Sequence, residues 1–362
     1  MAPAGAWSTA AALLWRSGYG PDIENLPDLV APFPDISSKA YEHPADRAAT
    51  AALKTLPGLD SVVRKLVEWG YERALRQAYL ANSVRVGPEQ LSELWASHTA
   101  VCRILDMPEV YDLYIAWGVR GAAQALGAGT PMIVMDSSLL TRLGAGEQRV
   151  VLGHEIGHIL SDHVLYMTVL NVLLSVTTAS LSPLGLPLRA VRAVLLEWYR
   201  AAELSCDRAS VLAVRDPRIV CRTLMVLGAG LPAEQLNVDA FIAQAMEYEG
   251  WDDSRDRARR VFHELGSTHP HAVRRVLEVT KWIQSGEYDR IVRGDYRRRA
   301  TEDTVREDAN DAMSFYAQRF RQIFHEAGEN IAHAGSQLGG VADQVTDWLR
   351  GRGGGDGPRE SA

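Results

Sequence analysis

Apolar residues recur at helical spacing along most of this chain. Between residues 60 and 82, for example, Val63, Leu66, Val67 and Tyr71 fall three or four positions apart. An α-helix repeats about every 3.6 residues, so these side chains line one face that can pack against a core. The same pattern predicts further helices over residues 45–56, 88–105 with Pro88 at the first position, 189–215, 218–227, 234–248, 254–263 and 308–333.

Two short apolar runs predict strands instead of helices. Residues 111–117 and 131–136 are rich in Tyr, Ile, Val and Met, which favour extended backbone. A stretch rich in glycine and alanine, residues 118–130, connects them. We therefore expect a small sheet within a mainly helical protein.

Residues 164–188 contain no charged side chain. The stretch is long enough to cross a bilayer, which takes about 20 apolar residues. Against a membrane span stand Pro183, Pro187 and several polar residues, among them Asn171. A buried hairpin between two helices is the favoured interpretation, and membrane contact is the alternative.

Composition and charge narrow the class of protein. Apolar residues make up 47% and charged residues 23% of the chain, as in ordinary globular proteins. The net charge of −7 gives no reason to expect nucleic acid as a partner. The cysteines at 102, 206 and 221 are far apart, which predicts reduced thiols in a cytoplasm and no disulfide framework. Residues 1–15 carry no Lys or Arg, so we expect no secretory signal.

One motif carries recognisable chemistry, and it lies on a stretch that reads as a helix. His154 and His158 are four positions apart, so they share a helix face and can offer ring nitrogens to one Zn²⁺. Glu155 points elsewhere but can reach a water on the metal, the general-base position of the His-Glu-x-x-His arrangement. The plain alternative is a chance pair of histidines beside a solvated glutamate.

A catalytic zinc needs a third protein ligand. Glu203 and Asp207 lie four positions apart on the long helix predicted over residues 189–215. If Glu203 binds the metal, Asp207 can accept a hydrogen bond from a ligand histidine and fix its orientation. In the alternative interpretation, both carboxylates pair with arginines on an ordinary charged face.

The order of three motifs resembles peptidase family M48, which includes the HtpX-like proteases and the CAAX prenyl proteases. The motifs are His154-Glu-Ile-Gly-His158, Glu203-Leu-Ser-Cys-Asp207 and Thr268-His-Pro, the last followed by an arginine. This resemblance implies one Zn²⁺ per chain, a general base, an oxyanion stabiliser before a proline, and two residues that order the site. The implied ligands are His154, His158 and Glu203, the base is Glu155, the oxyanion stabiliser is His269, and the ordering residues are Asp207 and Arg275.

The resemblance also implies the architecture. We expect an α+β, predominantly helical protein, in which a zincin-like catalytic domain with a small sheet carries helical N- and C-terminal extensions. In zincins, a strand edge beside the active helix pairs with extended substrate, and either predicted strand could supply it. The expected segments are an extended proline-rich stretch (1–43), helices packed on the core (44–106), the peptidase domain (107–300), a C-terminal amphipathic helical segment (301–350) and a disordered tail (351–362).

The expected function is that of a zinc metalloendopeptidase. It would hydrolyse peptides or unfolded proteins by metal-activated water, with Glu155 as general base. Two alternatives remain at this stage: a metal-bound scaffold without turnover, and a membrane-associated component of protein quality control. The expected location is the cytoplasm, with membrane association through residues 164–188 if that stretch is not a buried hairpin.

Overall fold

The computed structural model describes residues 30–54, 70–119, 121–127, 129–176, 185–250 and 268–300. These residues form a predominantly helical body with one small sheet, which confirms the expected α+β class. Several predicted segments lie wholly or partly outside the described residues: most of 1–43, the first part of the helix over 60–82, the helix over 254–263, the amphipathic helix over 308–333 and the tail over 351–362.

The sheet has four strands in the order β1-β2-β4-β3. Strand β2 (Asp112–Ala116) pairs in parallel with β4 (Met132–Asp136), and these confirm the two predicted strands. Strand β3 (Ala123–Leu126) lies in the stretch that the sequence suggested was a mere connection. Its small side chains hide the alternation that marks a strand. Strand β1 (Val84–Arg85), at the opposite edge, is too short for any pattern.

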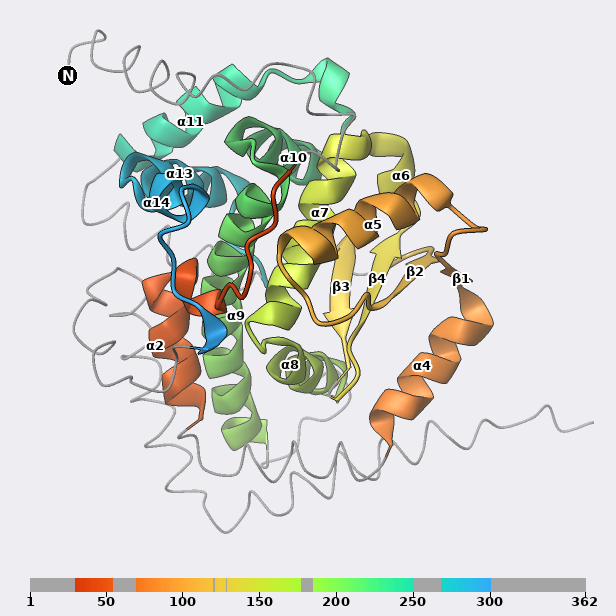
Figure 1. The fold of residues 1–362 in the computed structure, drawn as a ribbon. Helices are drawn as coiled ribbons and strands as arrows, with labels where there is room; N and C mark the ends of the chain where they lie inside the picture. The colour runs from red at the N-terminus through yellow and green to blue at the C-terminus, as the bar shows by residue number, and fades with distance from the viewer. Residues whose placement is uncertain are drawn as a thin grey trace, which may run out of the picture.

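Helices cover both faces of the sheet, which explains why every residue of β4 is buried. On one face, α4 (Tyr71–Asn82) places Leu75 and Tyr79 against a small cluster that includes Tyr114 and Val134. On the other face, Leu113, Ile133 and neighbouring strand residues join the main core together with α5 (Ser92–Ile104) and α7 (Ala145–Leu160). Figure 1 shows this sheet beside the central helices.

The prediction that a helix begins at Pro88 is wrong. Gly87 and Gln90 exchange backbone hydrogen bonds in a tight turn, and Leu91 adopts a left-handed conformation with φ of 58°. Helix α5 begins only after this turn, at Ser92.

Two helices run side by side through the centre of the molecule (Figure 1). One is α7, and the other is α9 (Gly185–Val214), which contains the predicted helix over residues 189–215 except for its last residue. Gly153 and Gly157 of α7 face α9 so closely that an added methyl group would lie 2.8 Å from Cβ of Ala213 and 2.7 Å from Cβ of Ala209, respectively. Glycine is therefore required for the observed spacing of these helices.

The uncharged stretch 164–188 is helical in its described parts. Helix α8 (Val164–Val176) packs against α9 and β3, and α9 begins at Gly185. Residues 177–184, where the hairpin would turn, lie outside the described residues. Among the helices described, none combines the length and the apolar character needed to cross a membrane.

The remaining helices surround the central pair. Helix α10 (Pro217–Ala229) confirms its prediction; Asp216 caps it and Pro217 occupies its first turn. The other elements are short or peripheral: the 3-10 turns Ser38–Ala40 and Ala233–Gln235, α6 (Leu139–Arg142), α11 (Val238–Gly250), α13 (Ala272–Gln284) and α14 (Glu287–Val292).

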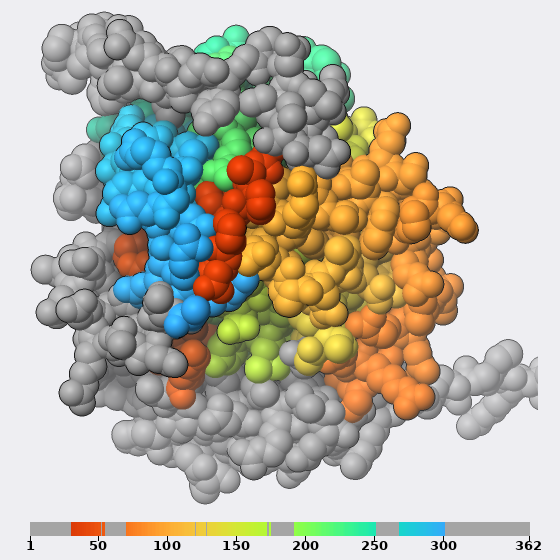
Figure 2. Space-filling view, viewed as in Figure 1, coloured from red at the N-terminus to blue at the C-terminus, as the bar shows by residue number. Residues whose placement is uncertain are grey.

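The N-terminal part of the described chain is tied into the body at two places. The segment around Ile36 runs between α5 and the residues that follow α14, where Ser37 N–H donates to the carbonyl of Arg297. Figure 2 shows this segment, in red, between the orange part of the chain, which includes α5, and the blue part, which includes the residues after α14. Helix α2 (Pro44–Leu53) then packs on α9 through Ala45, Ala201 and Leu204.

We expect Gly157→Ala to destabilise the protein by about 1–3 kcal/mol, the usual cost of overpacking a tight core. The added Cβ would collide with Ala209 and approach Cα of Cys206 at 3.3 Å, so the two helices must move apart. Thermal unfolding measures the change. Gly250→Ala is the matched control, because its Cβ would meet no atom of the described residues within 4 Å. Equal stability of both variants would contradict the close-packing argument.

Candidate active site

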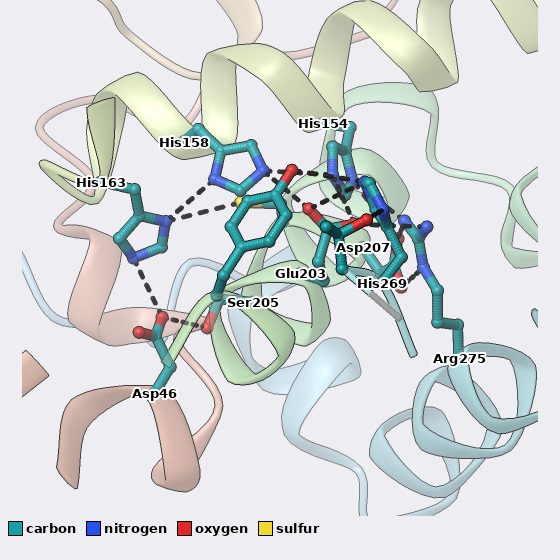
Figure 3. Close-up of polar contacts among 12 residues, drawn as sticks. Asp46, His154, His158, His163, Glu203, Ser205, Asp207, His269 and Arg275 are labelled. Atoms are coloured by element: carbon teal, nitrogen blue, oxygen red, sulfur yellow. Dashed lines mark hydrogen bonds and ion pairs between the residues drawn. The ribbon is translucent and has the colours of Figure 1, made fainter. Parts of the chain in front are cut away.

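The central helix pair brings the sequence-predicted site residues together (Figure 3). Helix α7 presents His154, Glu155 and His158, and α9 presents Glu203 and Asp207 from facing turns. Two further residues approach from the segment before α13 and from its first turns: these are His269 and Arg275. Every candidate residue named from the sequence therefore lies in one cluster.

Three donor groups in this cluster form a triangle: the rings of His154 and His158 and the carboxylate of Glu203. Nε2 of His154 and Nε2 of His158 are 3.2 Å apart. The Glu203 carboxylate places Oε2 3.4 Å from the first nitrogen and Oε1 3.3 Å from the second. Ligands about 2.0–2.1 Å from a tetrahedral zinc lie about 3.3–3.4 Å from one another. The three groups therefore lie about as far apart as zinc ligands do, with one carboxylate oxygen of Glu203 toward each histidine.

Cys206 is a competing donor, since its sulfur lies within 4.8 Å of a ring nitrogen of both histidines. A thiol must lose its proton to bind metal well. Burial raises the pKa of Cys206 well above its ordinary value, and the nearby carboxylates of Glu203 and Asp46 raise it further. The thiol would therefore have to release its proton on binding, whereas the Glu203 carboxylate is already ionised.

The charge state of the site fits a bound cation. Burial acts to raise the pKa of Glu203, but the positive charges of His269, His154 and Arg275 hold it well below its usual range. Both carboxylate oxygens are buried, and within the described residues neither makes a hydrogen bond of good geometry. A buried anion in this state is unusual unless it binds a metal or forms ion pairs. The residues present therefore fit a Zn²⁺ ion.

The two histidines differ in their titration. Burial opposes a charge on His154, yet the carboxylates of Glu203 and Asp207 raise its pKa to about 10. The site thus stabilises positive charge at the position where a metal would bind. Burial lowers the pKa of His158 to about 3, so this ring is neutral, as a metal ligand must be.

The outer nitrogen of His154 faces a fixed carboxylate. Its Nδ1 lies 3.3 Å from Oδ1 of Asp207. Arg275 holds that carboxylate with two hydrogen bonds, from Nη2 at 2.6 Å and Nε at 2.8 Å. Its Nη1 also lies 3.3 Å from Oε2 of Glu203. One arginine therefore orders both of these carboxylates of α9.

Glu155 lies on α7 between the two histidines and is 4% exposed. Burial raises the pKa of its carboxyl group to about 7, although the charge of His154 and a hydrogen bond from the backbone of Ala125 act to lower it. A carboxylate with a pKa near neutrality can both accept and return a proton at physiological pH.

His269 reaches the site from the side opposite α7. As the Thr268-His-Pro sequence predicts, it is not helical, because a proline disfavours helical geometry in the preceding residue. Its Nε2 lies 3.3 Å from the hydroxyl of Tyr199 and 3.8 Å from Oε1 of Glu203. The hydroxyl of Thr268 is 2.9 Å from its Nδ1. The ring is therefore held with Nε2 directed toward the ligand triangle.

A cavity of about 530 Å³ opens onto this cluster. A second, smaller and more apolar pocket of about 100 Å³ adjoins it at His269 and Tyr199. The volume of the first is in the range of small-ligand and peptide sites. Its lining includes Gly121, Ala122, Ala123, His154, Glu155, Tyr199, Glu203, Leu227 and His269.

Sequence reasoning missed two residues of this neighbourhood, His163 and Asp46, and named a third, Tyr199, only as the alternative to His269. Tyr199 stacks on the His158 ring with centroids 6.0 Å apart. His163 contacts His158, and Asp46 contacts His163. Helical spacing from Glu203 could have indicated Tyr199, which lies one turn earlier on α9. No spacing rule links Asp46 to the site, because it comes from a distant helix.

Comparisons with known proteins agree with this geometry. The model of peptidase family M48 matches residues 120–283, which include every candidate residue named from the sequence. The chain is 32% identical over 285 residues to the plastoglobule-localized metallopeptidase 48, chloroplastic, of Arabidopsis thaliana, a match that covers 75% of this chain and 80% of that protein. No solved structure gives a significant match. The chain therefore belongs to peptidase family M48, the metallopeptidase family that its motifs resemble.

Proposed function

We propose that this metallopeptidase is a zinc-dependent endopeptidase that cleaves peptides or unfolded proteins. The observation that carries the proposal is the triangle of His154, His158 and Glu203 donors, whose sides of 3.2–3.4 Å suit a tetrahedral zinc. These three residues would hold the ion. When bound, zinc would act as a Lewis acid that polarises the peptide carbonyl and makes water more acidic.

Glu155 is the proposed general base. It lies next to a ligand histidine, lines the open cavity and has a pKa near 7. Its carboxylate would accept a proton from the attacking water and return that proton to the amine that leaves. A group that performs both transfers must lose and regain its proton easily, and this pKa meets that requirement.

Strand β3 is the proposed docking edge for the substrate backbone. It is an edge strand, whereas the two strands predicted from the sequence, β2 and β4, both lie inside the sheet. Its first residue, Ala123, lines the cavity. The carbonyl of Ala122 accepts from Asp136 of β4, whereas the backbone of Ala125 turns away from β4 and donates to Glu155. Ala123 shares the orientation of Ala125, since alternate residues of a strand direct their backbone groups to the same side. An extended peptide could therefore pair with Ala123 and lie next to the base.

His269 and Tyr199 are the proposed oxyanion donors. Their polar atoms are 3.3 Å apart, and both residues line the cavity together with Glu155 and Glu203. A donor that is held in place before the reaction stabilises developing negative charge without reorganisation. Both side chains are already fixed by Thr268 and by the His158 ring, respectively.

The first prediction of this proposal concerns the metal. Purified wild type should contain about one zinc per chain, and Glu203→Ala should lose it, because two histidines alone bind zinc weakly. Cys206→Ser is the matched control on the same helix and should keep the zinc. Metal analysis by mass spectrometry measures the zinc content of each variant and so decides between Glu203 and Cys206 as the third ligand. Circular dichroism verifies that the variants are folded. Zinc retained without Glu203 but lost without Cys206 would show that the thiol is the ligand.

A second prediction separates the base from the ligands. Glu155→Gln should keep the zinc but slow the hydrolysis of casein or a peptide library by about 10²–10⁴-fold, the contribution of a general base. Glu147→Gln is the matched control: Glu147 is buried on the same helix and pairs with Arg222, away from the ligands. If wild type and Glu155→Gln cleave equally, Glu155 is not the base.

A third prediction concerns His269. His269→Ala should lower kcat by about 10²–10³-fold, as expected for loss of one oxyanion donor, while zinc content and KM change little. His271→Ala, two residues further on, is the control and should leave kcat nearly unchanged. Loss of zinc from His269→Ala would make this residue a ligand or the support of one. An unchanged kcat would leave Tyr199 as the better candidate.

A further inference from the structure

A row of three buried side chains leads away from the ligand triangle. Nδ1 of His158 lies 3.1 Å from Nδ1 of His163, and Nε2 of His163 lies 3.1 Å from Oδ2 of Asp46 (Figure 3). All three side chains are almost completely buried. Asp46 belongs to α2, which the sequence suggested was only packed on the core.

The Asp46 carboxylate is fixed at both oxygens. Ser205 donates its hydroxyl to Oδ2 at 2.6 Å, and Thr50 donates its hydroxyl to Oδ1 at 3.1 Å. Thr50 in turn accepts a hydrogen bond from Nε1 of Trp198 at 2.8 Å. Ser205 and Trp198 both lie on α9, the helix that carries Glu203. The carboxylate is thus held in place relative to the third ligand.

The proposed role of His158 as a metal ligand determines the direction of the hydrogen bonds in this row. A neutral imidazole that offers Nε2 to a metal carries its proton on Nδ1. That N–H therefore donates to Nδ1 of His163. The proton of the second ring must then be on Nε2, from which it donates to Asp46. In the opposite polarity, His158 would carry its proton on Nε2 and could not bind the metal.

Other neighbours of His163 agree with this assignment. The edge of its ring meets the face of Trp198, with centroids 5.5 Å apart and an interplanar angle of 85°. Sγ of Cys206 lies 3.8 Å from the same Nδ1, but a thiol is a weak donor. The shorter contact with His158 is therefore the main hydrogen bond at that nitrogen.

We propose that His163 and Asp46 are positioning residues that fix the tautomer and the ring orientation of ligand His158. His154 has its own support in Asp207, so each ligand histidine is oriented by a separate carboxylate. The carboxylate that orients His158 is that of Asp46, and it acts through His163. Since Asp46 lies on α2, this helix is part of the active site. This inference rests on the proposed function, since it takes His158 as a zinc ligand.

The test is the zinc affinity of purified full-length variants, measured by competition with a colorimetric chelator. His163→Leu should bind zinc about 10–100-fold more weakly than wild type, the usual effect of losing a residue that orients a metal ligand. His163→Gln should recover much of the affinity, because its amide can accept from His158 and donate to Asp46. Asp46→Asn, which keeps the size and removes the charge, should lie between wild type and His163→Leu.

A matched control separates positioning from ordinary stabilisation. His98 of α5 is also buried, and its Nε2 lies 2.8 Å from the backbone carbonyl oxygen of Tyr111, outside the row of His158, His163 and Asp46. His98→Leu should lower the melting temperature of the metal-free protein but leave zinc affinity unchanged. The melting temperatures of the metal-free variants at residues 46 and 163 are measured as well. They show whether a loss of zinc affinity in these variants goes beyond a general loss of stability.

The outcomes are distinct. Weaker zinc binding by His163→Leu with recovery in His163→Gln supports the inference. If His163→Leu does not fold, weaker zinc binding by folded Asp46→Asn supports it in the same way. Wild-type affinity in the folded variants at both positions overturns it while the proposed function stands, provided that Glu203→Ala still loses zinc. If wild type itself binds no zinc, the proposed function and this inference both fail.

Discussion

The close approach of α7 and α9 is the constraint on which the rest of the site depends. Gly153 and Gly157 let the backbone of α7 approach Ala209 and Ala213 without a side chain between them. Only at that distance can histidines on one helix and a short carboxylate on the other converge on one point. Glycine costs helix stability, about 1 kcal/mol relative to alanine. Its presence next to both ligand histidines is therefore explained by packing.

Burial of charge is the second organising feature. Glu203 and Asp207 are almost completely removed from water, where an isolated carboxylate would become neutral. Arg275 and His154 keep them ionised by direct contact. At Glu155, burial outweighs the nearby charge of His154, and the pKa of this carboxyl group rises to about 7. The same environment thus keeps Glu203 and Asp207 charged and leaves the neighbouring carboxyl group ready to exchange a proton.

Local sequence patterns predicted the parts of the fold and site that local spacing determines. His154 and His158, or Glu203 and Asp207, share a helix face through the four-residue interval alone, and the structure places them so. Strand β3 was not predictable in this way, since its alanines fit a loop, a strand or a helix. The contact of Asp46 with His163 depends on how α2 packs on α9, which no local pattern encodes. The features that could not be predicted from the sequence are therefore those that depend on packing between segments far apart in the chain.

The N-terminal segment wedged between α5 and the residues after α14 has a consequence for biosynthesis. Phe33 N–H donates to the carbonyl of Ile104, whereas Ser37 N–H donates to that of Arg297, close to the last described residue. A ribosome makes Ile104 early and Arg297 only when about four fifths of the chain has been made. Contacts of such wide sequence separation form slowly and late in folding. The nascent chain therefore cannot complete this body before residues 297–299 have left the ribosome. Through most of its synthesis the N-terminal segment lacks one of the two neighbours between which it lies.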